Sequence, residues 1–290
     1  MPKAAMIGRR SLLSLAGVVL AGSPQDGFAQ FAAPPVTLLS APMELVGQWD
    51  GSPPLAAAHV LARVREVSLA GVRLVSDQQP DRLRIDEHSS GPPAIWLHPE
   101  PAKTAWIIVD IRPRDWCKLA YQFGHELGHV LCNSWGPAAQ PRPPSQWLEE
   151  ALAEAFSIRG LGLLTTSWEK NPPFAGDAPF AAAIRSYRRN VVEGYRKQQA
   201  PGSDFALWFA ANRSELGRGL PEPEGPAVLA ILPELERDRG CVADLGAVNR
   251  WPARSGVPVE EFLSLWTKSC VELGAPGRLP VRLRELLALG

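Results

Sequence analysis

The chain has 290 residues, of which 46% are hydrophobic, so it is long enough to bury a core of ordinary size. Lysine plus arginine equals aspartate plus glutamate at 30 each, and the sequence pI is about 7.0. Because this balance gives no strong overall field, the composition argues against a nucleic acid or an anionic membrane surface as the partner.

The first 29 residues have the order of features of an export signal. Three basic residues, Lys3, Arg9 and Arg10, precede an apolar run over residues 12–21, and small and polar residues follow. This pattern predicts a cleaved signal peptide over residues 1–29 and a periplasmic or secreted protein. The adjacent arginines followed by Ser-Leu-Leu resemble a twin-arginine signal. The alternative is an N-terminal helix that is buried in the fold.

The apolar run near the N-terminus is too short to cross a bilayer. It has about ten residues, whereas a membrane-spanning helix needs ~20. No other window of the sequence is apolar over that length. We therefore expect no permanent membrane span.

The segments after the signal predict a helix followed by a small mixed sheet. Residues 30–54 are rich in proline and lack a sustained period, which indicates an irregular lead-in with room for one short strand. Good helix formers follow up to Gly71, a typical stop residue, so a helix is expected there. Three segments rich in valine, isoleucine and tryptophan then predict strands: residues 71–77, 94–99 and 104–111.

Residues 114–133 change to helical spacing and contain the sequence HELGH. Helix positions four apart differ by about 40° in direction and ~6 Å in rise, so His125 and His129 project from one face and can bind a single ion. Imidazoles at this spacing suit zinc. Glu126 lies about 100° round from His125, beside the ion, where its carboxylate can take a proton from an activated water molecule.

A catalytic zinc site with two histidines needs one more protein ligand and an open position. A third histidine at the spacing HExxHxxGxxH is absent, because Cys132 and Trp135 stand at the glycine and histidine positions. A second helix is predicted over residues 145–161, with Ser145 as the candidate N-cap. Glu150 on this helix is the favoured third ligand because Glu154 lies one turn later on the same side. The alternative that the neighbouring residue, Glu149, is the third ligand stays open.

With these residues in place, the sequence resembles the gluzincin class of zinc metallopeptidases, which includes thermolysin and zinc aminopeptidases. The resemblance covers residues 105–160, and Trp147 and Leu148 agree with the WLxE sequence of the aminopeptidase branch. The aminopeptidase recognition motif has no counterpart here. The resemblance implies a zincin-like core, Zn²⁺ as the cofactor and these roles: His125, His129 and Glu150 as ligands, Glu154 supporting a zinc histidine, and Glu126 as the general base.

Two further expectations concern the substrate. The resemblance implies that the strand at residues 104–111 is the sheet edge along which an extended peptide lies. Peptide hydrolysis also needs a donor that stabilises the oxyanion. The candidates are three tyrosines: Tyr121, one turn before His125, and Tyr187 and Tyr195 in a later helical segment. A tyrosine on an amphipathic helix is more often a packing residue whose hydroxyl contacts water.

Four cysteines fit an oxidising compartment and allow two disulfides: Cys117, Cys132, Cys241 and Cys270. If residues 116–132 form one helix, Cys117 and Cys132 lie roughly 22 Å apart along it and cannot pair. Any bridge from this helix would then run to Cys241 or Cys270, and a single bridge between Cys241 and Cys270 with two free thiols stays open.

The order helix, sheet, two helices and a helical remainder predicts an α+β protein. We expect four parts: a signal peptide (1–29), a lead-in (30–54), a zincin-like metal-binding core (55–170) and a mostly helical C-terminal part (171–290) with four or five helices. The predicted function is an exported zinc-dependent peptidase acting on peptides or proteins. The alternative is a non-catalytic secreted domain that uses zinc as a structural staple or for partner binding. A closed fourth coordination position, for which Cys132 is the candidate, would favour that alternative.

Overall fold

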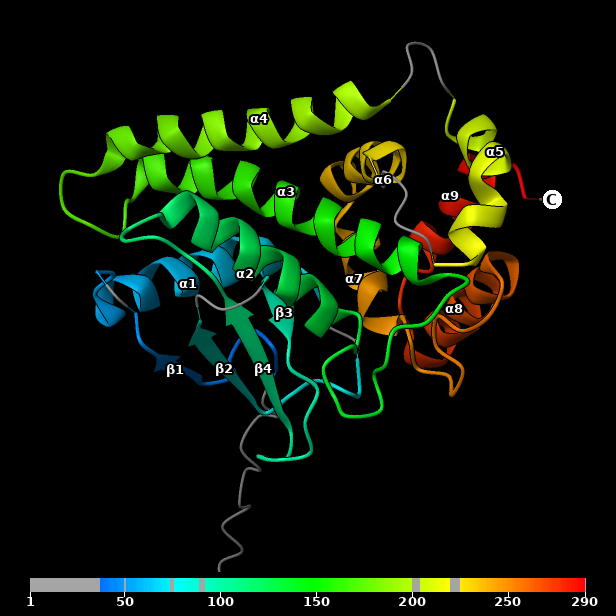
Figure 1. Cartoon of the computed structure of the whole chain (residues 1–290), viewed down its shortest axis with the longest axis horizontal. Coiled ribbons are helices and arrows are strands. Elements are labelled where there is room, and N and C mark those ends of the chain that lie inside the picture. The colour runs from blue at the N-terminus through cyan, green and yellow to red at the C-terminus, as the bar shows by residue number, and fades with distance from the viewer. Residues whose placement is uncertain are drawn as a thin grey trace, which may run out of the picture. The chain divides into compact units, whose positions relative to one another are not determined.

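A small sheet and two layers of helices form the first half of the described chain (Figure 1). The computed structural model describes residues 37–49, 51–73, 76–88, 92–199, 204–219 and 225–289. The predicted signal peptide lies outside these residues. The strands are β1 (Met43–Gly47), β2 (Arg82–Glu87), β3 (Ala94–Ile95) and β4 (Thr104–Val109).

The sheet is mixed, with the strand order β1-β2-β4-β3. β1, β2 and β4 run parallel, and β3 pairs antiparallel with β4. The expectation of an α+β protein with a small mixed sheet is thus confirmed. The expectation that residues 104–111 form the sheet edge is wrong, because β4 lies between β2 and β3. The edge on that side is β3.

Residues 71–73 and 76–77, the described part of the strand predicted at residues 71–77, are not in a strand, and residues 74–75 lie outside the described residues. The central parallel strand is β2. In β2, the buried Leu83 and Ile85 alternate with charged residues of the opposite face. A strand with only one buried face reads as polar in composition, so a search for apolar runs passes over it. The one strand in the predicted lead-in, β1, pairs along its whole length with β2.

Helices α1 (Pro54–Leu69) and α2 (Trp116–Leu131) pack on one face of the sheet, and α3 (Gln146–Lys170) packs across both of them. Asp115 caps α2 by accepting a hydrogen bond from the backbone N–H of Lys118 at 3.1 Å. α3 is buried nearly all round because α1 and α2 lie on one side of it and C-terminal helices on the other.

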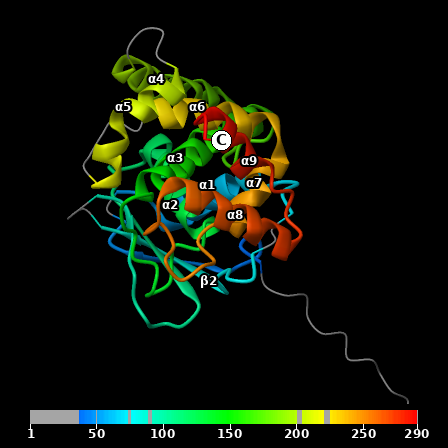
Figure 2. The same cartoon turned by 90° about the vertical axis from the view of Figure 1, so that its right-hand side faces the viewer.

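The chain after α3 is helical and continues the same core. The described residues of this part contain six α-helices, more than the four or five expected: α4 (Ala181–Gln198), α5 (Phe205–Gly217), α6 (Gly225–Arg237), α7 (Arg239–Asp244), α8 (Val259–Leu273) and α9 (Arg278–Leu286), with 3₁₀ turns η1 (Ala178–Phe180) and η2 (Leu245–Ala247). α4 and α6 lie along α3, while α7, α8 and α9 gather on one side (Figure 2). One cluster of buried side chains joins this part to the sheet.

The cysteines and the helices of the structure bear on the expectations about disulfides and membrane spans. All four cysteines are buried as free thiols, so the disulfides that their number allows are not formed. Within the described residues, no helix combines the length and the apolar character needed to cross a bilayer.

Candidate metal centre

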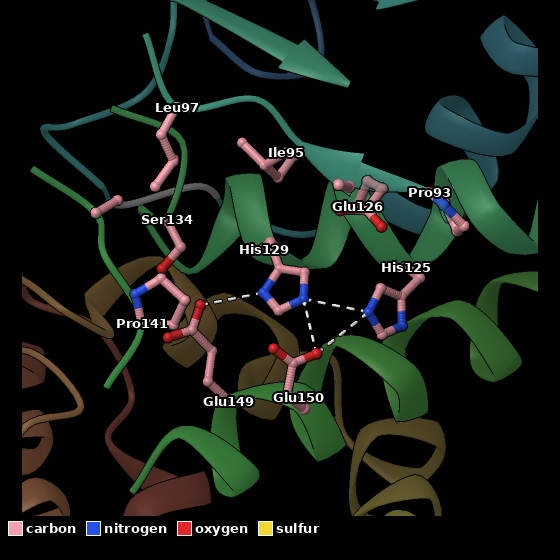
Figure 3. A pocket seen from close by; sticks show the side chains of 12 residues that line it. Pro93, Ile95, Leu97, His125, Glu126, His129, Ser134, Pro141, Glu149 and Glu150 are labelled. Carbon is pink, nitrogen blue, oxygen red and sulfur yellow. Dashed lines mark hydrogen bonds and ion pairs between the residues drawn. The ribbon is translucent and has the colours of Figure 1, made fainter. Parts of the chain in front are cut away.

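Three potential ligand atoms from α2 and α3 converge at one point (Figure 3). Nε2 of His125 and Nε2 of His129 are 3.2 Å apart. Oε2 of Glu150 lies 3.5 Å from the first and 3.3 Å from the second. A tetrahedral zinc ion with bonds of ~2.0–2.1 Å keeps neighbouring ligand atoms ~3.3–3.4 Å apart. The three atoms therefore fit one face of a zinc tetrahedron and leave the fourth corner open.

A buried carboxylate lies beside the Nδ1 atom of each histidine, on the side of the ring away from the converging atoms. Nδ1 of His125 lies 2.9 Å from Glu154, and Nδ1 of His129 lies 3.1 Å from Glu149. When Nδ1 carries the proton and donates it to a carboxylate, the lone pair of Nε2 is free for an ion. α3 thus carries one candidate ligand, Glu150, and two carboxylates that contact the candidate histidines, and Glu149 contacts His129 instead of joining the three converging atoms.

The sequence contained a signal for the support by Glu149. Two ligand histidines need two acceptors behind them. The helix with Glu150 carries two further glutamates near the site, Glu149 and Glu154, which is one for each histidine. From the sequence, Glu149 is predicted only as a competing ligand, so the structure adds its role as a support of His129.

Tyr121 completes the support of His125. Its hydroxyl donates a hydrogen bond to Oε1 of Glu154 at 2.6 Å, which leaves Oε2 of Glu154 for the imidazole. The ring of Tyr187 packs against Tyr121 at a centroid distance of 5.7 Å. None of the three tyrosines, Tyr195 included, lines the cavity at the metal centre. The structure therefore does not bring an expected oxyanion donor to the cavity.

Close packing of α2 against α3 lets Glu150 reach the histidines. A Cβ atom on Gly128 would lie only 2.8 Å from Cα of Ala153, and one on Gly124 would lie 2.9 Å from Oγ of Ser157. Ser157 also donates a hydrogen bond across the contact to the carbonyl of Tyr121, at 2.7 Å. The two glycines of α2 therefore set the distance between the helices.

The metal centre opens into a cavity of about 240 Å³. One wall is formed by the chain at and beside β3, with Pro93, Ile95 and Leu97. Ala139 and Pro141, from the loop between α2 and α3, contribute apolar surface on another side. The fourth corner of the tetrahedron therefore has space beside it for a molecule larger than water.

Glu126 lines this cavity, and its carboxylate has no hydrogen-bond partner among the described residues. Its residue is only 3% exposed, yet no group among the described residues donates a hydrogen bond to its carboxylate. Burial raises the pKa of Glu126, while the nearby His125 and His129 act in the opposite direction. An unpartnered carboxylate beside the ligand histidines is chemically suited to accept a proton.

Charge couples the ligands to one another. Burial lowers the pKa of His125, but hydrogen bonds with Glu150 and Glu154 outweigh burial and raise it to about 9. For Glu150, burial acts to raise the pKa, but its hydrogen bonds with the two histidines lower it well below the usual range. The donor set thus consists of two imidazoles and a carboxylate, a common set for catalytic zinc.

Comparisons with known proteins give this chain no relatives: no family model, no curated protein and no solved structure matches it. Function is therefore inferred from the residues of the site itself. There, the structure brings His125, His129 and Glu150 together, puts Glu149 and Glu154 behind the histidines, and lines the adjoining cavity with Glu126.

Proposed function

We propose that this chain is a zinc-dependent peptidase of the gluzincin type, with a zincin-like core. One observation carries the proposal: the three candidate ligand atoms, 3.2 to 3.5 Å apart, lie on the wall of a cavity that is also lined by Glu126, to whose carboxylate no described residue donates a hydrogen bond. A site that only stores or binds an ion has no use for such a base.

In the proposed reaction the chain's residues position the water and move its proton. A bound zinc ion supplies Lewis-acid polarisation of the scissile carbonyl and lowers the pKa of the attacking water. Glu126 accepts the proton of that water and then delivers it to the leaving nitrogen, so that its carboxylate is restored. Glu149 and Glu154 keep the two imidazoles in the tautomer and orientation that the ion needs.

The edge strand β3 supports an extended peptide as the substrate. Trp96 donates its backbone N–H to the carbonyl of Trp106 at 2.9 Å, and Ala94 pairs with Ile108. In an antiparallel pair the intervening residue, Ile95, directs its backbone N–H and C=O away from the partner strand. Ile95 also lines the cavity. A peptide that adds to this edge as a further strand would therefore pass beside the metal centre.

The alternative, a non-catalytic domain held by a structural zinc, needs a closed fourth position. Cys132, the candidate for that position, is fully buried at the end of α2 and is not part of the converging group of side chains. No fourth protein ligand joins the group among the described residues. The open corner therefore supports the peptidase.

Export is the remaining part of the proposal, and it depends on the sequence of residues 1–29. We expect the mature protein to begin after Ala29 and to be found outside the cytoplasm. N-terminal sequencing of the soluble protein tests this, and an intact Met1 would contradict it.

Metal analysis of the purified protein, paired with digestion of a broad peptide mixture, tests the function. We expect one zinc per chain and peptide cleavage that stops with a chelator and returns when zinc is added. Zinc binding without any cleavage would favour the structural alternative. Cleavage that a chelator leaves unchanged, in protein free of metal, would contradict the proposal.

A further inference from the structure

The connection between η2 and α8 is hydrogen-bonded to residues next to both helices of the candidate metal centre, α2 and α3. Near the end of α2, the amide of Asn133 donates a hydrogen bond to the carbonyl of Val248 at 2.7 Å. Just before α3, the hydroxyl of Ser145 donates one to the carbonyl of Val257 at 2.6 Å. Residues 248–257 therefore bridge the two elements whose relative position sets the ligand geometry, and we refer to them as the bridging segment.

Asn249 in the bridging segment reaches the metal centre through Glu149. It is 1% exposed, and its Nδ2 donates a hydrogen bond to Oε2 of Glu149 at 2.6 Å. The other oxygen of Glu149 lies 3.1 Å from Nδ1 of His129. These hydrogen bonds connect His129 through Glu149 to Asn249, which lies 100 positions after Glu149 in the sequence.

Arg254 fixes the place of Asn249. Its Nη1 donates a hydrogen bond to the carbonyl of Asn249 at 3.0 Å, and its Nη2 donates to the carbonyl of Asn133 and to Oγ of Ser134, both at 2.9 Å. The same Ser134 oxygen lies 3.0 Å from Nδ2 of Asn249. Asn249 is thus held at its backbone by Arg254, which itself contacts Asn133 and Ser134 after the end of α2, and at its side chain by Ser134.

We infer that Asn249 is a positioning residue of the metal centre, which fixes the Glu149 carboxylate so that it orients His129. This inference rests on the metal centre of the proposed function but not on its peptidase activity. A carboxylate with a single partner can rotate about its side-chain torsions, whereas one held at both oxygens keeps its acceptor in line with the imidazole. The helical C-terminal part is then a component of the zinc site.

A matched pair of substitutions separates positioning from general stability. Asn249 and Asn133 are both buried, both have a positive φ (59° and 64°), and both donate from Nδ2 across the same interface. Only Asn249 contacts Glu149. Because glycine adopts positive φ without strain, Asn249→Gly and Asn133→Gly each remove a carboxamide and keep the backbone conformation.

The measurement is zinc affinity, obtained by competition with a chromophoric chelator, with no substrate present. We expect Asn249→Gly to weaken zinc binding by roughly 10- to 100-fold and Asn133→Gly to weaken it far less. Cobalt substitution adds a spectroscopic check, since a displaced His129 changes the absorption of the bound ion. Should Asn249→Gly fail to fold, Asn249→Asp keeps the size and turns the donor toward Glu149 into a second carboxylate, so it should weaken binding at least as much.

A double substitution decides whether Asn249 acts through Glu149. In a Glu149→Ala background, Asn249→Gly should cause no further loss of zinc affinity. The inference is overturned if Asn249→Gly and Asn249→Asp bind zinc like the wild type, or if the loss is equally large without Glu149. A wild-type protein that binds no zinc overturns the proposed function as well, whereas zinc binding without peptide cleavage leaves this inference standing.

Discussion

Gly128 on α2 lies directly against Ala153 on α3, so close that a Cβ on Gly128 would come within 2.8 Å of Cα of Ala153. Gly128 precedes the ligand His129 by one residue, and Ala153 follows the ligand Glu150 by three. The contact between the helices and the contact between the ligands are therefore set by the same few residues. A change in the distance between α2 and α3 here would change the distances between the candidate ligand atoms.

Gly128→Ala should consequently destabilise the fold and weaken zinc binding together. The added methyl meets backbone, which cannot move aside, so we expect a loss of about 1–3 kcal/mol in the free energy of unfolding. Gly194→Ala in α4 is the control, because its methyl meets nothing within 4 Å and alanine favours a helix by about 0.5–1 kcal/mol. Denaturant unfolding and zinc competition measure both effects. Wild-type stability in Gly128→Ala would show that the helices are not in this close contact.

The neighbouring glutamates should respond differently to removal. Glu150→Ala should abolish stoichiometric zinc, as His125→Ala and His129→Ala should, because each removes a ligand atom. Glu149→Ala and Glu154→Ala should weaken affinity by roughly 10- to 100-fold and still fill at saturating zinc, because they remove only the support of a histidine. Equilibrium dialysis with metal analysis distinguishes the two outcomes. If Glu149→Ala abolishes stoichiometric zinc and Glu150→Ala keeps it, Glu149 is the ligand and Glu150 the support.

Zinc binding should weaken as the pH falls. Hydrogen bonds with Glu150 and Glu154 outweigh burial and raise the pKa of His125 in the metal-free protein to about 9. Zinc needs the neutral imidazole, so binding below pH 9 displaces a proton, and the apparent Kd should rise about tenfold per pH unit for each proton displaced. Chelator competition at pH 6.5, 7.5 and 8.5, with proton release followed in weak buffer, measures this. A Kd that does not change with pH would contradict these ion pairs.

The raised pKa of His125 predicts that the metal-free protein becomes less stable as the pH rises, whereas zinc binding becomes stronger. Because the folded pKa of His125 lies above its unfolded value of about 6.5, the charged imidazole stabilises the fold fully below pH 6.5. This contribution is lost as the pH rises through 9. Thermal unfolding of chelated protein across this range is the measurement. His125→Gln is the control, because it removes the titration of residue 125 and leaves that of His129, whose pKa is also raised despite burial, by hydrogen bonds with Glu149 and Glu150.

The parts of the site that share a helix could be predicted from the sequence. The spacing of His125 and His129 and the acidic residues of α3 follow from helical periodicity, which operates over a few residues. Contacts between distant segments are not encoded in spacing. The hydrogen bond from Asn249 to Glu149 joins residues 100 positions apart, and nothing near Asn249 in the sequence marks it.

The sheet was harder to predict than the helices for a related reason. β2 alternates buried Leu83 and Ile85 with charged residues, so its composition resembles that of a surface loop. Strand order also depends on which segments pair, and propensity does not determine pairing. The resemblance implies that β4 is the sheet edge, whereas in the structure β4 lies between β2 and β3.

Glu126→Gln tests the central claim most directly, because it keeps the size of the side chain and removes the basic oxygen. We predict one zinc per chain in both the wild type and Glu126→Gln, nearly equal thermal stability, and a loss of ~10²- to 10⁴-fold in the rate of peptide hydrolysis. If the wild type, loaded with one zinc, cleaves nothing in a broad peptide set and Glu126→Gln matches it in every assay, the chain is a zinc-binding domain and not a peptidase.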